Sequence, residues 1–337
     1  MQQSIVFGLR GAAARLAPAA EARDFPRTRF LLTRFLKRVP TEPAGEPPVE
    51  PAASPSPAPV VRAASAPRVH PFAIVDPKAR IGDDCEIGPF CTVGPHVVMG
   101  PGNKLDSHVV ITGHTTIGAD NRFFPNAVIG AIPQDKKYRG EETQLVIGDR
   151  NAIREAVTIH LGTVGGGGVT RVGSDNLLMV NCHVGHDCTI GSFCILGNNV
   201  MLAGHTVLHD RVNMSGASAT NHYVTVGPYA FIAALGRIHH DVPPFMKVSD
   251  DDKIRDVNTE GLRRAGIPAE DIDEIEKAAR QLFFARKNKR PFAVVMSAYE
   301  ADPATHPRVQ ELVAFLRRRD TGKSGRYLES LRVKNKS

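Results

Sequence analysis

The sequence predicts a parallel β-helix followed by a C-terminal α-helical domain, and three observations support this. Apolar residues recur at every sixth position over much of the chain, glycine often follows them, and the period becomes helical in the last quarter. A period of six fits neither an α-helix nor an ordinary strand and is the hexapeptide repeat of a parallel β-helix. We therefore expect three parts: residues 1–68, residues 69–252 and residues 253–337.

Residues 1–68 are rich in proline, alanine and arginine and contain no hexad. They hold 10 basic and 5 acidic residues, a net charge of +5. Such a segment cannot bury enough apolar surface to fold alone, so we expect a disordered extension. Two alternatives remain open, an organelle transit peptide and an incorrectly assigned start codon. No apolar run in the sequence reaches the roughly 18 residues that a membrane span requires, and we expect a cytoplasmic protein.

The hexads of residues 69–252 form three runs: Val75 to Ile129, Ile147 to Ile159, and Val172 to Ile238. Three hexads close one triangular coil, so each strand should pair with the strand three hexads later. Side chains alternate across a strand, so the residue two before each apolar position should also point inward and be small. The cysteines occupy that position, and we expect small buried thiols rather than zinc ligands. They are Cys85, Cys91, Cys182, Cys188 and Cys194.

Residues 253–337 carry a net charge of +7, against −5 for residues 69–252. Apolar residues from Ile272 to Phe283 keep the spacing of one helix face, and Pro268, Glu270 and Asp271 precede or open that helix. A second helix is expected over Val309 to Leu316. Helices at this end would cover the exposed backbone groups of the last coil. Their basic surface is also a candidate docking site.

Two polar excursions interrupt the hexads, at residues 131–146 and 161–171, and interruptions of a regular scaffold are where function concentrates. The second contains four consecutive glycines and is expected to lie over a ligand or a neighbouring subunit. His186 falls at a corner beside it, and the residue one coil later is Gly204. A base would thus lie beside a backbone amide that can stabilise an oxyanion. Three more histidines flank this position: His160, His183 and His205.

Seven stretches of this sequence resemble the acyl-(acyl-carrier-protein)–UDP-N-acetylglucosamine O-acyltransferases, the first enzymes of lipid A biosynthesis. The resemblance covers roughly residues 69–290 in order. It is carried by residues 134–138, Ile-Arg-Glu-Ala-Val-Thr-Ile-His at 153–160, Gly-Ser-Asp-Asn-Leu-Leu-Met at 173–179, His-Val-Gly-His-Asp-Cys at 183–188, Leu-Ala-Gly-His at 202–205, Asp-Val-Pro-Pro at 241–244 and Asn-Thr-Glu-Gly-Leu-Arg-Arg at 258–264.

The resemblance implies a left-handed β-helix, a homotrimer, and transfer of a 3-hydroxyacyl group from acyl carrier protein to the 3-hydroxyl of UDP-N-acetylglucosamine. It requires no metal and no cofactor, because the donor is carried on the phosphopantetheine arm of acyl carrier protein. It implies His186 as general base, Asp187 as its orienting partner and Gly204 as oxyanion donor. Substrate-binding roles are implied for Gln134, Asp135, Lys137, Tyr138, His160, His183, His205, Asn258, Glu260 and Arg264.

The chain departs from the family pattern at two places. Ala219-Thr220-Asn221-His222-Tyr223 stands where the family usually has Ala-Val-His-Gln-Phe on the donor side, and Ala234 stands where long-chain members have glycine. The second change implies a somewhat shorter acyl chain. Other readings remain: a related N-acyltransferase, which would carry a uridine-binding N-terminal domain, a γ-type carbonic anhydrase with zinc held by histidines, and an inactive scaffold. No nucleic-acid partner is expected.

Overall fold

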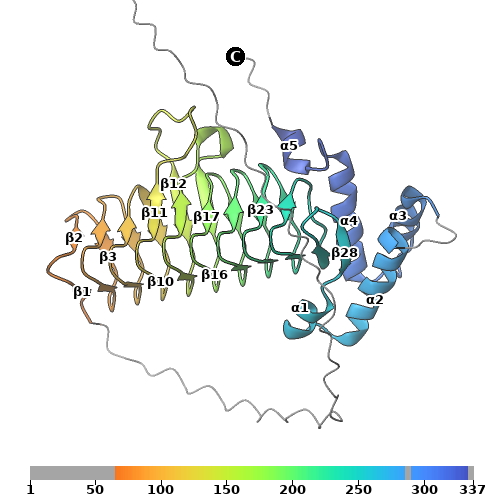
Figure 1. Cartoon of the computed structure of the whole chain (residues 1–337), viewed down its shortest axis with the longest axis horizontal. Helices are drawn as coiled ribbons and strands as arrows, with labels where there is room; N and C mark the ends of the chain where they lie inside the picture. The colour runs from red at the N-terminus through yellow and green to blue at the C-terminus, as the bar shows by residue number, and fades with distance from the viewer. Residues whose placement is uncertain (1–64, 285–289, 333–337) are drawn as a thin grey trace, which may run out of the picture. The chain divides into compact units, whose positions relative to one another are not determined.

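The computed structural model describes residues 65–284 and 290–332, and the prediction of a disordered extension lies outside this range apart from residues 65–68. The described residues belong to one compact unit, residues 61–337. Within it, short strands wind into a triangular prism and helices follow at its C-terminal end (Figure 1). No helix in the described part of the chain is long and apolar enough to cross a membrane.

Among the described residues, the strands form three sheets, one on each face of the prism. The eleven-stranded sheet contains β1 (Arg68–Val69), β4 (Glu86–Ile87), β7 (Lys104–Leu105), β10 (Arg122–Phe123), β13 (Ala152–Ile153), β16 (Leu177–Leu178), β19 (Ile195–Leu196), β22 (Asn213–Met214), β25 (Phe231–Ile232), β27 (Met246–Val248) and β28 (Ile254–Val257). The nine-stranded sheet contains β2 (Ile74–Val75), β5 (Thr92–Val93), β8 (Val110–Ile111), β11 (Val128–Ala131), β14 (Thr158–His160), β17 (His183–Val184), β20 (Met201–Leu202), β23 (Ala219–Thr220) and β26 (Arg237–Ile238). The eight-stranded sheet contains β3 (Arg80–Ile81), β6 (Val98–Met99), β9 (His114–Ile117), β12 (Gln144–Ile147), β15 (Val169–Val172), β18 (Thr189–Ile190), β21 (Val207–Leu208) and β24 (Thr225–Val226).

The pairing confirms the repeat. Val69 pairs in parallel with Ile87, three hexads further along. The apolar position of each hexad fills the prism, and the cysteines are completely buried two residues before it. Burial raises the pKa of the Cys188 thiol to about 12, as expected for a structural thiol. Thr220 is a polar residue at an apolar position of the third run of hexads; it is buried, and its hydroxyl lies 2.8 Å from that of Thr206.

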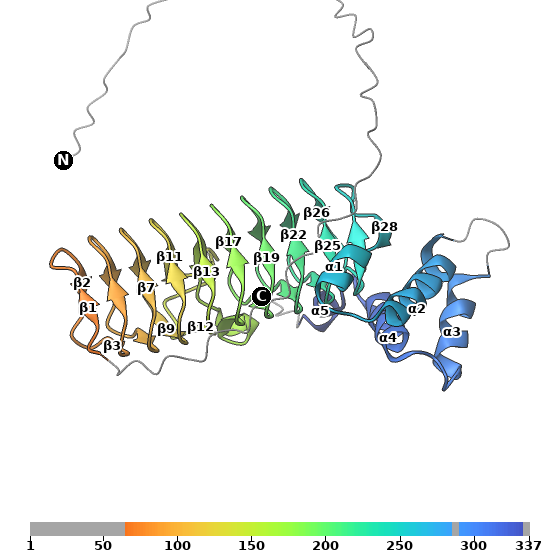
Figure 2. The ribbon, with the colours of Figure 1, turned by 90° about the horizontal axis from the view of Figure 1, so that it is seen from below.

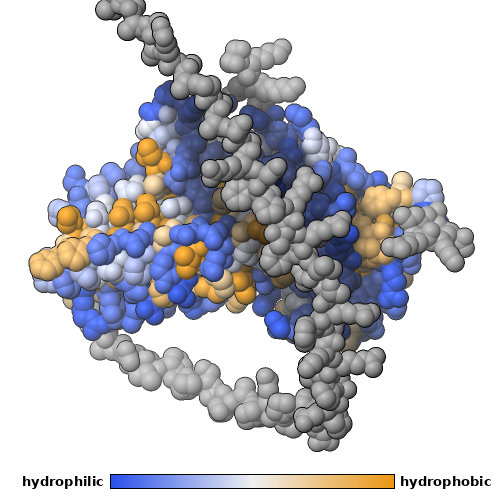
Figure 3. Space-filling model, viewed as in Figure 1, coloured by the Kyte–Doolittle hydropathy of each residue, from blue (hydrophilic) through white to orange (hydrophobic). Residues whose placement is uncertain are grey.

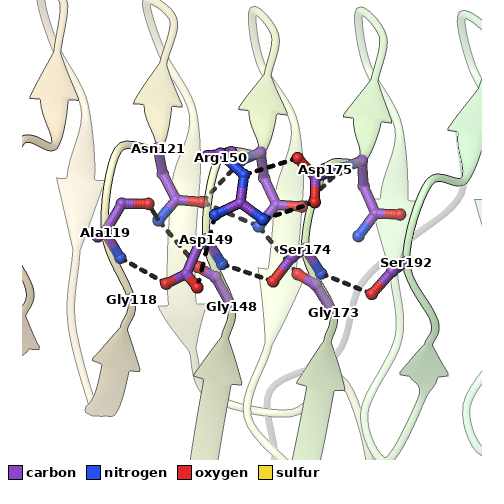
Figure 4. Close-up of polar contacts among 12 residues, drawn as sticks. Gly118, Ala119, Asn121, Gly148, Asp149, Arg150, Gly173, Ser174, Asp175 and Ser192 are labelled. Carbon is purple, nitrogen blue, oxygen red and sulfur yellow. Dashed lines mark hydrogen bonds and ion pairs between the residues drawn. The ribbon is translucent and has the colours of Figure 1, made fainter. Parts of the chain in front are cut away.

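The corner between the eight-stranded and eleven-stranded sheets holds a ladder of buried asparagines, here called the asparagine corner: Asn103, Asn121, Asn151 and Asn176. Asn121 Oδ1 accepts from the backbone N–H and from Nδ2 of Asn151, at 2.9 and 2.8 Å. Asn121 Nδ2 donates to Asn103 Oδ1 and to the Gly148 carbonyl, each at 2.9 Å. Around the ladder, Arg150 forms a two-point ion pair with Asp175 (Figure 4). Each amide thus satisfies backbone groups that a corner leaves unpaired.

The C-terminal helices confirm the predicted change of period. The helical elements are α1 (Thr259–Arg264), α2 (Ala269–Ala279), the π-helical turn η2 (Arg280–Phe284), α3 (Phe292–Ala301), α4 (Pro307–Thr321) and α5 (Tyr327–Leu331). Ile272 and Ile275 of α2 and Leu312 of α4 form a second core with Phe245 and Met246 of the last coil. The predicted boundary at residue 252 falls just before β28, which pairs antiparallel with β27.

The two ends of the prism differ. The helices α1, α2 and α4 follow the last coils, as the view from below shows (Figure 2). At the other end, Val69 of β1, Phe72 in the following turn and Ile74 of β2 are exposed, and apolar side chains gather there (Figure 3). The helical cap therefore covers one end of the sheets, while the first coil leaves its apolar side chains in contact with solvent.

Candidate active site

Both excursions leave the prism at one corner, where the nine-stranded sheet turns into the eight-stranded sheet. Ile117 pairs with Ile147, 30 residues on, and Ile147 pairs with Val172, 25 residues on, whereas uninterrupted coils repeat every 18. Residues 132–143 join β11 to β12, and residues 161–168, with the short 3₁₀ helix η1 (Val164–Gly166), join β14 to β15. Figure 1 shows both excursions on one side of the prism. We call this the histidine corner, because His160, His183, His186 and His205 lie on or beside it.

His186 lies in the turn after β17, half-buried beside Asp187. Its Nδ1 lies 2.7 Å from Asp187 Oδ2. Since a carboxylate only accepts, Nδ1 carries the proton and Nε2 keeps its lone pair in the neutral ring. A Cβ placed on Gly204, one coil further, would lie 2.6 Å from Cε1 and 2.7 Å from Nε2 of this imidazole. The predicted neighbours therefore lie together, and only glycine leaves room for the ring.

The second excursion holds Asp187 in place. Thr163 donates to the Asp187 carboxylate from its backbone N–H at 2.7 Å and from its hydroxyl at 2.6 Å. The Asp187 backbone N–H donates to Thr170 Oγ1 at 2.8 Å. Burial raises the pKa of Asp187, but the hydrogen bonds from His186 and Thr163 outweigh it and hold the pKa below its ordinary value. The carboxylate is therefore charged at neutral pH and fixes the imidazole.

The glycine run allows this close contact. A Cβ at Gly166 would fall 2.1 Å from Cγ of Asp187, so the loop lies directly over the carboxylate of its own chain. This gives the loop a role that the sequence did not indicate, because the expectation placed it over a ligand or a neighbouring subunit.

A row of aromatic rings extends from His186 along the histidine corner. The ring centroids of His186 and His205 lie 5.0 Å apart, edge to face at 88°. His205 stacks on Tyr223 at 4.3 Å with an angle of 5° between the planes. Asp187, His205 and Tyr223 are spaced by one coil, and each has a positive φ near 60°. Tyr223, noted from the sequence only as a departure, is thus part of the site.

His160 and His183 form a second pair on the adjoining strands, with ring centroids 5.1 Å apart. His160 is buried, and its Nδ1 donates to the carbonyl of Ile132 at 2.7 Å, so the first excursion covers it. His183 Nδ1 lies 2.9 Å from Thr158 Oγ1. Burial lowers the pKa of His183, and the neighbouring histidines lower it further. The His183 ring is therefore favoured in the neutral form.

The first excursion also carries Gln134, Asp135, Lys137 and Tyr138, as expected from the resemblance. Asp135 shapes the loop, because its side chain accepts from the Lys137 backbone N–H at 2.9 Å. The Tyr138 hydroxyl donates to the Glu141 carbonyl at 2.8 Å. Burial raises the pKa of Tyr223, and the negative charge of Asp135 contributes to the increase. The first excursion therefore lies close enough to the row of rings for its charge to act on Tyr223.

Four predicted site residues lie elsewhere on this chain. Asn258 caps α1 at the end of the asparagine corner, with its amide bonded to the Tyr229 carbonyl and the Gly261 N–H. Glu260 and Arg264 form an exposed ion pair on α1. Ala234 is exposed in the turn after β25, at the third corner of the prism. One copy of the chain therefore does not bring these residues to His186, and their roles stay predictions.

Little in the sequence indicates which residues support His186. Thr163 lies inside an irregular loop, and Thr170 lies just after it. Asp187, His205 and Tyr223 are spaced by one coil, so the sequence alone could have placed them side by side. It did not single them out, because the three residue types do not share one chemical role.

His186, Asp187 and His205 also have ligand atoms within 4.8 Å of one another, a spacing that a metal ion could use. Both Asp187 oxygens already accept hydrogen bonds from Thr163, and one of them binds His186 as well. The His186 nitrogen that faces Asp187 carries a proton in this contact and so has no lone pair for a cation. The contacts favour an oriented imidazole.

Comparison with known families gives two matches. Residues 241–325 match the second domain of UDP-N-acetylglucosamine O-acyltransferases, and residues 170–213 match the bacterial transferase hexapeptide repeat. A UDP-N-acetylglucosamine acyltransferase from Bacteroides fragilis 9343 superposes with a TM-score of 0.70 at 37% identity, covering 74% of this chain and 96% of that one. The fold is therefore a left-handed parallel β-helix with a C-terminal helical region, as expected.

Two relatives match over a larger part of the chain. An acyl-(acyl-carrier-protein)–UDP-N-acetylglucosamine O-acyltransferase of Stenotrophomonas maltophilia (strain K279a) is 46% identical over 223 residues, which are 66% of this chain and 85% of that protein. One from Anaeromyxobacter sp. (strain Fw109-5) is 44% identical over 250 residues, or 74% and 96%. The chain thus belongs to the acyl-(acyl-carrier-protein)–UDP-N-acetylglucosamine O-acyltransferase family.

Proposed function

We propose that this protein transfers a 3-hydroxyacyl group from acyl carrier protein to the 3-hydroxyl of UDP-N-acetylglucosamine, the first step of lipid A biosynthesis, with His186 as general base. The observation that carries the mechanism is the contact of His186 with Asp187 on one side and Gly204 on the other. An imidazole oriented through Nδ1 presents Nε2 to a hydroxyl proton. Family membership supports the choice of substrates.

The reaction follows from these three residues. Nε2 of His186 takes the proton as the sugar oxygen attacks the thioester carbonyl, and Asp187 stabilises the imidazolium that forms. The negative charge on the carbonyl oxygen is placed to accept a hydrogen bond from the Gly204 amide. When the tetrahedral intermediate collapses, the C–S bond breaks and the imidazolium returns its proton to the leaving thiolate. No metal or cofactor takes part in these steps.

The positions of the remaining candidates support a homotrimer. His186, Asn258 and Ala234 lie at three different corners of the prism. A single substrate meets all three only if neighbouring copies supply them, so we place the site between subunits. The net charge of +7 on residues 253–337 suits an acidic carrier protein. We place the protein in the cytoplasm, where both substrates are soluble.

Incubation of the purified protein with UDP-N-acetylglucosamine and a panel of 3-hydroxyacyl carrier proteins tests the activity. Mass spectrometry is expected to show the sugar nucleotide gaining one 3-hydroxyacyl group, with a preferred chain length. Absence of acyl transfer from every donor would overturn the proposal. Light scattering tests the assembly, and a purely monomeric protein that turns over would contradict the intersubunit site.

A further inference from the structure

The chain returns to the histidine corner after the part that matches the family domain. That match ends at residue 325, and the described chain continues to Arg332. We call residues 325–332 the C-terminal strap. Its helix α5 has no buried residue. A cavity of about 120 Å³ lies beneath it, lined in part by His209, Phe315 and Tyr327. Apolar packing alone therefore does not fix the strap.

Polar contacts to Asp241 hold the strap on the prism. Asp241 is buried, and it lies one coil beyond Tyr223. Its Oδ2 accepts from the Tyr327 N–H at 2.8 Å, and its own N–H donates to the Gly325 carbonyl at 2.8 Å. Its Oδ1 accepts from the Thr225 N–H at 2.8 Å. Nearby, Arg326 Nη1 donates to the His239 carbonyl at 2.8 Å. The strap is thus tied to the same corner that carries the ring row.

These contacts bring Arg332 to the end of the ring row. Its guanidinium carbon lies 5.7 Å from the centroid of the Tyr223 ring, which in turn stacks on His205. A guanidinium at this distance from an aromatic face is attracted to it, so the ring helps to position the charge. His205 then contacts His186, and the row joins Arg332 to the proposed base through two rings.

The Arg332 guanidinium has N–H donors that can bind an anion. Within the described chain, its acidic neighbour is Glu329, at 3.6 Å, which is longer than a hydrogen bond. About half of the Arg332 side chain is exposed, at 51%. Glu329 also lies 3.9 Å from Lys323, so its charge is shared between two cations. Several N–H donors of Arg332 are left to bind a ligand in the planar fork geometry that matches phosphate oxygens.

We propose that Arg332 is a substrate-binding residue that recognises a phosphate ester at the end of the ring row. The phosphate belongs either to the diphosphate of the sugar nucleotide or to the phosphodiester of the carrier-protein arm, and this identification rests on the proposed function. Tyr223 positions the guanidinium, and Asp241 positions the strap. The strap thereby adds a binding contact from outside the family domain.

Steady-state kinetics of Arg332→Ala, with Arg317→Ala as control, test the proposal. Arg317 on α4 has a similarly exposed side chain and pairs with Glu300, so its removal changes the net charge equally. Arg332→Ala should raise the KM of one phosphate-bearing substrate about five- to tenfold, the loss expected for a partly exposed charge-assisted hydrogen bond. The kcat should stay within about twofold. Arg332→Lys should restore part of the binding, and Arg317→Ala should resemble the wild type.

Two donors distinguish the sources of the phosphate. If the donor arm is the ligand, Arg332→Ala weakens acyl-phosphopantetheine but not acyl-pantetheine, which lacks the phosphate. If the nucleotide is the ligand, the KM of UDP-N-acetylglucosamine rises with either donor. Unchanged KM values for all substrates would overturn the inference while leaving the proposed function intact.

Calorimetry separates failure of the inference from failure of the function. Titration of wild type and Arg332→Ala with UDP-N-acetylglucosamine and with 4′-phosphopantetheine needs no turnover. A higher Kd in the variant for one ligand supports the inference even where no acyl transfer occurs. Equal Kd values in the two proteins, or no binding of either ligand to the wild type, would reject it.

Discussion

The asparagine corner and the histidine corner are built on the same repeat, yet they use their polar side chains in opposite ways. At the asparagine corner, Asn121 directs both its amide nitrogen and its carbonyl oxygen to neighbouring coils. At the histidine corner, His186 uses Nδ1 for Asp187 and leaves Nε2 directed towards Gly204. A side chain whose hydrogen-bonding groups are all satisfied stabilises the fold, whereas an imidazole that keeps one nitrogen for a ligand can act as a base.

The two polar excursions also separate the histidine corner from the asparagine corner. Both excursions extend from the histidine corner, while the asparagine ladder continues through the same coils without a break. The two longer coils repeat after 30 and 25 residues, and their extra residues all leave the prism at the histidine corner. An insertion at the asparagine corner would separate buried amides that depend on neighbouring coils. Functional loops are therefore confined to the corner that does not carry the ladder.

The largest effect should come from His186→Ala at the histidine corner. Loss of a positioned general base should lower kcat by about 10² to 10⁴-fold. The melting temperature should change far less, because the His186 ring, 11% exposed at the corner, lies outside the hydrophobic core of the prism. His183→Ala provides the comparison and should act more on KM. Near-normal turnover in a folded His186→Ala protein would eliminate the proposed mechanism.

The corresponding change at the asparagine corner is Asn121→Ala, which should affect stability instead of turnover. Removing the amide leaves buried groups of Asn103, Asn151 and Gly148 without that partner. An unsatisfied buried group costs about 1–3 kcal/mol, so the free energy of unfolding should fall by at least about 2 kcal/mol. Urea denaturation measures this. Asn198→Ala, an exposed asparagine at another corner, should be nearly neutral, and equal losses for the two variants would contradict the ladder's role.

A smaller effect is expected for Gly204→Ala. The added methyl group would displace the His186 imidazole, and misplacing a catalytic group by a fraction of an ångström should lower kcat by about tenfold or more. Gly216→Ala is the matched control, because it lies at the same turn position of another corner and its Cβ would meet only the Asn198 carbonyl at 3.3 Å. Equal activity of the two variants would show that the close approach at Gly204 has no catalytic consequence.

Sequence reasoning recovered the regular part of the molecule because period and register are local properties. The inward cysteines, the pairing three hexads apart and the contact of His186 with Gly204 all follow from counting residues along a coil. The helix α2 was found from its apolar spacing and its acidic start.

The irregular parts were not predicted, because nothing in a local pattern says where a loop folds back. The contact of Thr163 with Asp187 depends on the path of a loop in a coil that is seven residues longer than a regular one. The contact of Tyr327 with Asp241 joins residues 86 positions apart. The asparagine ladder is visible in the sequence only when the registers of both excursions are already known.

The smallest effect should appear in the pH dependence of stability between pH 7 and 5, to which the histidine corner contributes through His205. Burial lowers the pKa of His205 below its ordinary value near 6.5, and His186 lowers it further, although Asp187 opposes the shift. The unfolded chain then binds more protons than the folded one in this range, so the free energy of unfolding should fall as the pH drops through about 6.5. His205→Gln should flatten this part of the curve, as measured by urea unfolding at stepped pH values, whereas Asn121→Ala should lower the whole curve without changing its slope. A slope that is unchanged in His205→Gln would mean that the ring takes up protons equally in the folded and unfolded states, and would remove the electrostatic distinction between the two corners.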